Sequence, residues 1–170
     1  MRIIGLFVCL FISACSGGEF PQDVGPNLGR AELAINGGQD DYSSTFVVGV
    51  QMGDNGNCSG TLIAPYLVLT AYHCVAQGED VAVDCTSYRF GRQYSANEIT
   101  VTTEFNMDTA RRTYPVREIV GPNNDPSICG EDLALLILNQ AIPNSEAQPI
   151  APRLNEKVQA FESASAVGFG

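Results

Sequence analysis

The sequence is poor in metal ligands. It has one histidine, His73, among 170 residues, and none of its six cysteines belongs to a Cys-x-x-Cys pair. Structural zinc sites usually combine such pairs with further cysteine or histidine ligands. We therefore expect no metal site.

Basic residues are also scarce. Nine Lys and Arg stand against 19 Asp and Glu, which gives a formal net charge of −10. Such a charge repels phosphate backbones and anionic headgroups, so we expect no nucleic-acid partner. The hydrophobic content of 45% is ample for a core, so the chain is expected to fold.

The apolar run at the start of the chain is too short to span a bilayer comfortably. It extends from Ile3 to Ile12 behind Arg2 and ends in small residues, which is typical of a secretory signal over residues 1–14. Its end resembles the bacterial lipobox, in which the cysteine after the cut is lipidated. We expect export, with either a lipid anchor on the cell envelope through Cys15 or an ordinary cut that leaves a secreted chain.

Residues 15–34 show no sustained apolar period. They are rich in Gly, Pro and polar residues, which predicts a tether or propeptide without a core of its own.

The rest of the chain has neither an internal repeat nor a sustained helical period. It contains short apolar or alternating runs separated by turn residues, which is typical of strands. A closed all-β barrel is expected, because closure removes the exposed edges of so many short strands. The runs are "STFVVGVQM", "SGTLIA", "YLVLT", "DVAVD", "SYRF", "EITVT", "YPVREIV" and "LALLIL".

Four cysteines remain once the signal and Cys15 are set aside, and they allow three pairings. A Cys58–Cys74 disulfide would close a loop worth about 3 kcal/mol, and Cys85–Cys129 a longer one worth about 4 kcal/mol. We expect this pairing. Metal binding and free structural thiols are the other uses of these side chains.

The segment "CSGTLIAPYLVLTAYHCV", from Cys58 to Val75, resembles the histidine region of trypsin-like (chymotrypsin-family) serine proteases. Three further stretches resemble the family in the same order. "INGG" from Ile35 is similar to the mature amino terminus, "EDLALLIL" from Glu131 to the catalytic-aspartate strand, and "AVGFG" at the end to the Gly-Trp-Gly strand that opens the second barrel. The resemblance covers everything after the tether.

This resemblance implies a Greek-key β-barrel of the chymotrypsin type. The first of the family's two barrels would cover residues 35–150. Residues 151–170 would be the crossing linker and the first strand of a second barrel that is otherwise missing. An activation cut before Ile35 is a hypothesis, because Ala34 stands where the family has Arg or Lys.

The resemblance also implies catalytic roles for His73 and Asp132. Imidazole titrates near neutrality and can accept and return a proton, and a carboxylate fixes its tautomer. The substrate would be a protein or peptide, and no cofactor is implied. The alternatives are a hydrogen-bonded turn histidine and a simple turn carboxylate, whereas a Cys74–His73 thiol dyad is disfavoured because adjacent side chains point apart.

The family's nucleophile lies in a Gly-Asp-Ser-Gly-Gly motif, which these 170 residues lack. Ser145, Ser163 and Ser165 follow Asp132, but none has the glycines of an oxyanion hole. Ser59 is expected to be structural. The resemblance thus implies the amino-terminal portion of an exported serine endopeptidase, inactive alone, of undefined oligomeric state. The alternative is a non-catalytic protease homologue that acts as a surface binding module.

Tyr72 departs from the family pattern, which has a small alanine before the histidine. The turn must accommodate a phenol, and we expect its side chain to point toward the substrate cleft.

Overall fold

The computed structural model describes residues 38–169, apart from 54–55, 79–83, 86–87 and 123–127. The chain divides into two units, Met1–Ala31 and Glu32–Gly170, and the second contains every described residue. The signal peptide, the Cys15 anchor, the tether and Ile35 lie outside the described residues. None of the helices within the described ranges has the length and apolar character that crossing a membrane requires.

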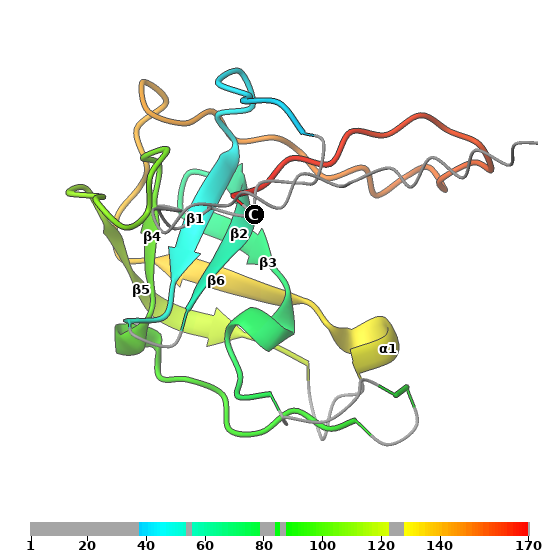
Figure 1. Ribbon diagram of the computed structural model, residues 1–170, viewed down its shortest axis with the longest axis horizontal. Helices are drawn as coiled ribbons and strands as arrows, with labels where there is room; N and C mark the ends of the chain where they lie inside the picture. The colour runs from blue at the N-terminus through cyan, green and yellow to red at the C-terminus, as the bar shows by residue number, and fades with distance from the viewer. Residues whose placement is uncertain (1–37, 54–55, 79–83, 86–87, 123–127, 170) are drawn as a thin grey trace, which may run out of the picture. The chain divides into compact units, whose positions relative to one another are not determined.

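Six antiparallel strands form a closed barrel, as the sequence predicted (Figure 1). Their order around the barrel is β1-β2-β3-β6-β5-β4, and β4 pairs with β1 to close it. Because β4 lies beside β1 while β1, β2 and β3 follow one another, the connection is a Greek key. The strands are β1 (Val47–Gln51), β2 (Asn57–Ala64), β3 (Leu67–Thr70), β4 (Thr100–Thr102), β5 (Tyr114–Val120) and β6 (Ala134–Leu138).

Among the described residues, the helical elements named here are short. They are the 3₁₀ turns η2 (Tyr72–Cys74) and η3 (Ala96–Glu98) and the single-turn α1 (Ile128–Glu131). Figure 1 shows α1 directly before β6.

The barrel interior is filled by alternate residues of the strands. In β6, for example, Ala134, Leu136 and Leu138 are buried while the residues between them are partly exposed, which is the period-two pattern of a half-buried strand. Gly60 in β2 permits a close approach of the strands, because a Cβ there would lie 2.6 Å from Val68 Cγ1. The largest fully buried side chains are those of Leu62, Ile99, Leu136, Leu138, Ile142, Val48, Val50, Val68, Val75, Val101 and Thr102.

Two of the expected strands need separate mention, one untested and one wrong. Most of "DVAVD" lies outside the described residues. The run "SYRF" was predicted as a strand, but its described part, Tyr88 to Phe90, belongs to no named strand. The Tyr88 N–H instead donates to the Asp84 carbonyl at 2.9 Å, a local turn contact, and the Tyr88 ring packs edge-on against Phe90.

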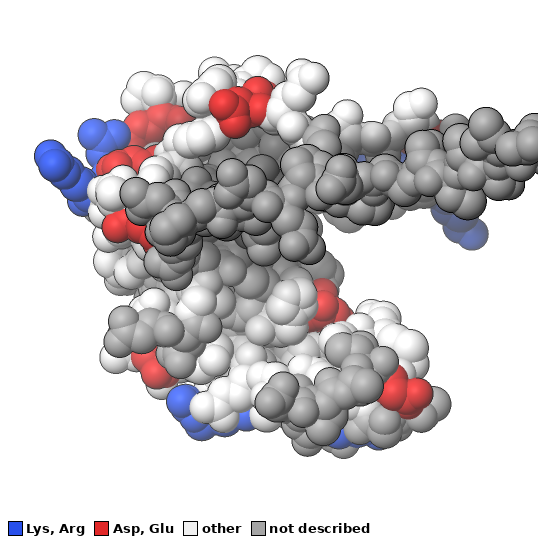
Figure 2. All heavy atoms as spheres, viewed as in Figure 1, with Lys and Arg blue, Asp and Glu red and all other residues white. Residues whose placement is uncertain are grey.

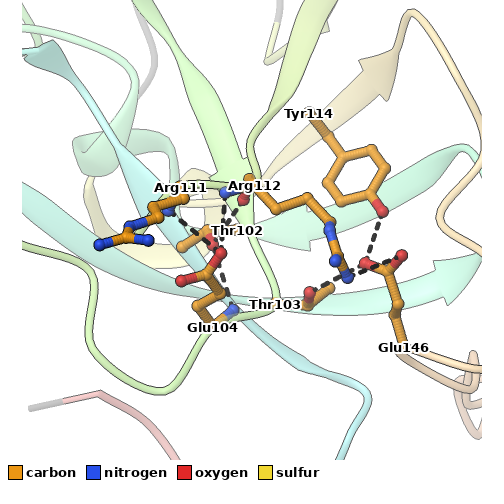
Figure 3. Close-up of polar contacts among 7 residues, drawn as sticks. All are labelled: Thr102, Thr103, Glu104, Arg111, Arg112, Tyr114 and Glu146. Atoms are coloured by element: carbon orange, nitrogen blue, oxygen red, sulfur yellow. Dashed lines mark hydrogen bonds and ion pairs between the residues drawn. The ribbon is translucent and has the colours of Figure 1, made fainter. Parts of the chain in front are cut away.

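The loop between β4 and β5 is closed by its own polar groups (Figure 3). Glu104 Oε1 accepts hydrogen bonds from the backbone N–H groups of Arg111 and Arg112, at 3.1 and 2.8 Å. The Thr102 hydroxyl donates to the Arg112 carbonyl at 2.9 Å. These bonds satisfy backbone groups that a loop would otherwise leave to water.

Glu146, from the segment after β6, anchors this loop to the barrel (Figure 3). Its carboxylate accepts the Tyr114 hydroxyl at 2.6 Å and the Thr103 hydroxyl at 3.3 Å, and it pairs with Arg112 at 3.0 Å. The Tyr114 hydrogen bond is the main cause that lowers the pKa of Glu146. Burial, followed by the bond to Glu146, raises the pKa of Tyr114 to about 12.

The segment after β6 first packs against the barrel and then extends away from it. The Ile142 N–H donates to the Pro65 carbonyl at 2.9 Å, and the Ile150 N–H donates to the Leu62 carbonyl at 3.0 Å. Residues 166–169, expected to be the first strand of a second barrel, are not assigned to any β-strand in this structure. The division of the chain at residue 151 therefore stays a prediction.

Charged side chains are spread over the face of the molecule in Figure 2. Acidic groups occupy separate positions, and Lys and Arg lie mostly at the margins. Among the described residues visible there, the acidic excess forms no single patch.

Candidate active site

His73 occupies the middle of η2, the turn that follows β3. Its neighbours Tyr72 and Cys74 are buried, whereas the His73 side chain is 51% exposed. The Cys74 N–H donates to the Ala71 carbonyl at 3.2 Å and the Val75 N–H to the Tyr72 carbonyl at 2.9 Å. The turn thus buries both flanks and presents the imidazole outward.

Disulfides flank both predicted catalytic residues, in the pairing expected from the sequence. Cys74, next to His73, is joined to Cys58 in β2, with the Cα atoms 6.1 Å apart. Cys129 in α1 is joined to Cys85, with the Cα atoms 5.3 Å apart. Each cross-link therefore restrains the backbone close to one member of the site.

Asp132 is brought to the turn by the strand register. Thr70, at the end of β3, lies opposite Ala134, at the start of β6. Asp132 precedes Ala134 by two residues and η2 begins two residues after Thr70, so both lie just beyond the same end of this strand pair. Gly130 helps the chain into this position, because its φ of 98° is a left-handed conformation that glycine adopts without strain.

The two residues are joined by a double contact. Asp132 Oδ1 accepts the backbone N–H of His73 at 2.8 Å, and Asp132 Oδ2 lies 2.7 Å from His73 Nδ1. A carboxylate only accepts hydrogen bonds, so Nδ1 carries the proton and donates to it. In the neutral ring, Nε2 is then left with a free lone pair.

Chemically, this arrangement is an oriented base beside a carboxylate. The Asp132 side chain is 23% exposed, so its charge is partly shielded from water. In the described part of the chain no serine hydroxyl is paired with the His73 ring. Ser59, expected to be structural, has its Oγ engaged as acceptor of the Phe169 N–H at 2.7 Å, which places the end of the described chain beside β2.

Cys58, His73 and Cys74 form a group of potential metal ligands, with ligand atoms within 4.8 Å of one another. The two sulfurs are bonded to each other, and a disulfide is not the thiolate that binds metals. The group therefore does not fit a metal ion.

Tyr72 does not point toward a cleft, contrary to the expectation from the sequence. It is 6% exposed and its ring packs edge-on against Phe90, with centroids 4.9 Å apart. The reason is a buried space beside Gly121, where the absence of a Cβ leaves room for the phenol ring. No local pattern around Tyr72 could have revealed this space, because Phe90 and Gly121 come from distant segments.

Comparison with known proteins adds independent findings. The family model described as Trypsin matches residues 35–170. Among solved structures, human heparin binding protein is 21% identical with a TM-score of 0.48, and the match covers 69% of this chain and 48% of that one. A structure of GrC is 22% identical with a TM-score of 0.48, and the match covers 69% of this chain and 48% of that one. The matched part thus spans about half the length of these structures, and no curated protein matches.

Proposed function

The chain belongs to the trypsin family, and from this premise we propose that it supplies the general base and the orienting carboxylate of a serine endopeptidase. His73 is the base and Asp132 the carboxylate. The observation that carries the proposal is the double contact between them, in which one carboxylate holds both the backbone N–H and Nδ1 of His73.

The contact supports a defined sequence of proton transfers. With Nδ1 protonated, Nε2 of His73 takes the proton of a serine hydroxyl as that oxygen attacks a peptide carbonyl. The imidazolium then returns the proton to the leaving amine. Throughout, Asp132 remains ionised and stabilises the positive ring.

The nucleophile of this reaction would have to come from outside residues 1–170. Residues 1–170 contain no Gly-Asp-Ser-Gly-Gly motif. Ser145, Ser163 and Ser165 are exposed and lack neighbouring glycines that could form an oxyanion hole. The 170 residues alone are therefore expected to hydrolyse no peptide at a useful rate.

Export to an oxidising compartment is part of the proposal. Two disulfides support it, because such bonds persist mainly outside the cytosol.

Lipidation at Cys15 is tested by labelling cells with a clickable fatty acid, comparing the wild type with Cys15→Ser. Amino-terminal sequencing of the native protein tests Ile35, since a start at Cys15 in active material would overturn activation by that cut.

A fluorophosphonate probe tests the catalytic proposal, because it reacts only with an activated serine. The protein is produced from the full natural reading frame, in wild-type form and as His73→Ala. We expect labelling of the wild type and its loss in the variant. Unlabelled wild-type protein would instead favour the non-catalytic homologue that acts as a surface binding module.

A further inference from the structure

The ring of Tyr72 lies directly against the backbone of Gly121, the residue after β5. A Cβ added at Gly121 would lie 2.5 Å from Tyr72 Cε2 and 2.9 Å from Tyr72 Cδ2, both well inside van der Waals contact. Gly121 is not among the glycines with positive φ, so its backbone would accept another residue. The phenol ring is therefore what requires a glycine at this position.

The Tyr72 ring also packs against a row of aromatic side chains. Phe90 meets Tyr72 edge-on at 4.9 Å and an interplanar angle of 83°, and Tyr88 meets Phe90 at 5.5 Å with the same angle. Since packed interiors have little free volume, a displacement of the Tyr72 ring also disturbs its contact with this aromatic row. A side chain at residue 121 that displaces the Tyr72 ring would therefore also displace the Tyr72 backbone.

That backbone carries the catalytic turn. Tyr72 and His73 are consecutive residues of the three-residue η2, whose other end is fixed by the disulfide of Cys74. The His73 N–H and Nδ1 must both reach Asp132. We propose that Tyr72 and Gly121 form a steric pair, in which the glycine leaves the Tyr72 ring the space it needs for His73 to stay against Asp132 and a larger residue 121 would displace ring and turn together, an inference that rests on the proposed role of His73 as base.

The test reads the His73 ring in the 170-residue chain by two-dimensional ¹H–¹⁵N NMR. One histidine gives one imidazole signal, and its ¹⁵N shifts report which nitrogen carries the proton in the neutral ring. The wild type and Tyr72→Phe, which keeps the ring, are expected to show the form protonated at Nδ1. Gly121→Ala is expected to change this form to a mixture of the two tautomers.

The double variant Tyr72→Ala/Gly121→Ala separates positioning from general damage. Removal of the ring makes room for the new methyl group, so the double variant should recover the Nδ1-protonated form that Gly121→Ala loses. Recovery supports the pair, including the case in which Gly121→Ala alone does not fold. A Gly121→Ala chain with the wild-type tautomer, or a double variant no better than Gly121→Ala, would overturn it.

The outcome is independent of peptide hydrolysis, because no nucleophile takes part in the measurement. If the fluorophosphonate experiment fails while the tautomer is rescued, the proposed function is wrong and the steric pair stands. If labelling succeeds and the tautomer does not respond, only the steric pair is wrong.

Discussion

Asp132 holds His73 at two atoms, with Oδ1 accepting the backbone N–H at 2.8 Å and Oδ2 lying 2.7 Å from Nδ1. One side chain therefore fixes the position of the turn and the tautomer of the ring together. Asp132→Asn should separate these effects, because an amide has one acceptor oxygen and one donor nitrogen.

We predict that Asp132→Asn moves the proton of the neutral His73 ring away from Nδ1, which ¹⁵N shifts of the chain would report. Glu131→Gln, which removes the adjacent carboxylate, is the matched control and should leave the tautomer unchanged. Retention of the wild-type tautomer in Asp132→Asn would contradict the role given to Asp132.

The Cys58–Cys74 disulfide should contribute to stability as well as to the turn. Replacement of both cysteines by alanine is expected to lower the free energy of unfolding by about 3 kcal/mol, because the unfolded chain regains the entropy of a closed loop. Urea unfolding monitored by circular dichroism measures the change. A loss below about 1 kcal/mol would show that the bridge restrains little of the unfolded chain.

Two glycines of the barrel should respond differently to substitution by alanine. At Gly60 the new Cβ would meet Val68 Cγ1 at 2.6 Å inside the packed core, whereas at Gly49 it would meet Met107 Sδ, near the end of a flexible side chain, at 2.5 Å. Gly60→Ala is expected to destabilise the fold by about 1–3 kcal/mol, and Gly49→Ala by less, because Met107 can move aside. Equal losses in urea unfolding would contradict this explanation.

Glu146 should make stability depend on pH. Its pKa in the folded state lies below the ordinary value of 4.5, so its stabilising effect is complete above about pH 4.5 and is lost as pH falls through the folded-state pKa. Glu146→Gln is expected to cost about 1–2 kcal/mol at pH 7 and less at pH 3.

The comparison is made by urea unfolding at both pH values. Glu118→Gln, at an exposed position of β5, serves as the control with little expected change. A difference between wild type and Glu146→Gln that stays constant with pH would exclude this carboxylate as the cause.

The barrel could be predicted from the sequence because its strands are marked by local patterns. The run that became β6 has alternate buried residues, and turn residues bound most of the others. The candidate residues His73 and Asp132 could be singled out because the segments around them resemble a known family, and their catalytic roles stay a prediction. The detail of the double contact depends on the register of β3 with β6, which only the folded structure defines.

Contacts between distant segments account for what the sequence did not predict. The Tyr72 side chain was expected to point toward the substrate cleft, and its burial depends on Gly121 and on an aromatic ring from another loop. Glu146 was not singled out, because its partners Tyr114 and Arg112 lie in and before β5 and nothing beside Glu146 in the sequence indicates them.

The most direct test of the central claim is the rate of peptide hydrolysis by the protein made from the full natural reading frame, compared with its Asp132→Asn variant at neutral pH. We predict measurable hydrolysis by the wild type and a loss of about 10⁴-fold in kcat in the variant, the size known for this substitution in serine protease triads. Equal rates in the two proteins, or no hydrolysis by the wild type, would contradict the claim that His73 and Asp132 are the base and orienting carboxylate of a peptidase.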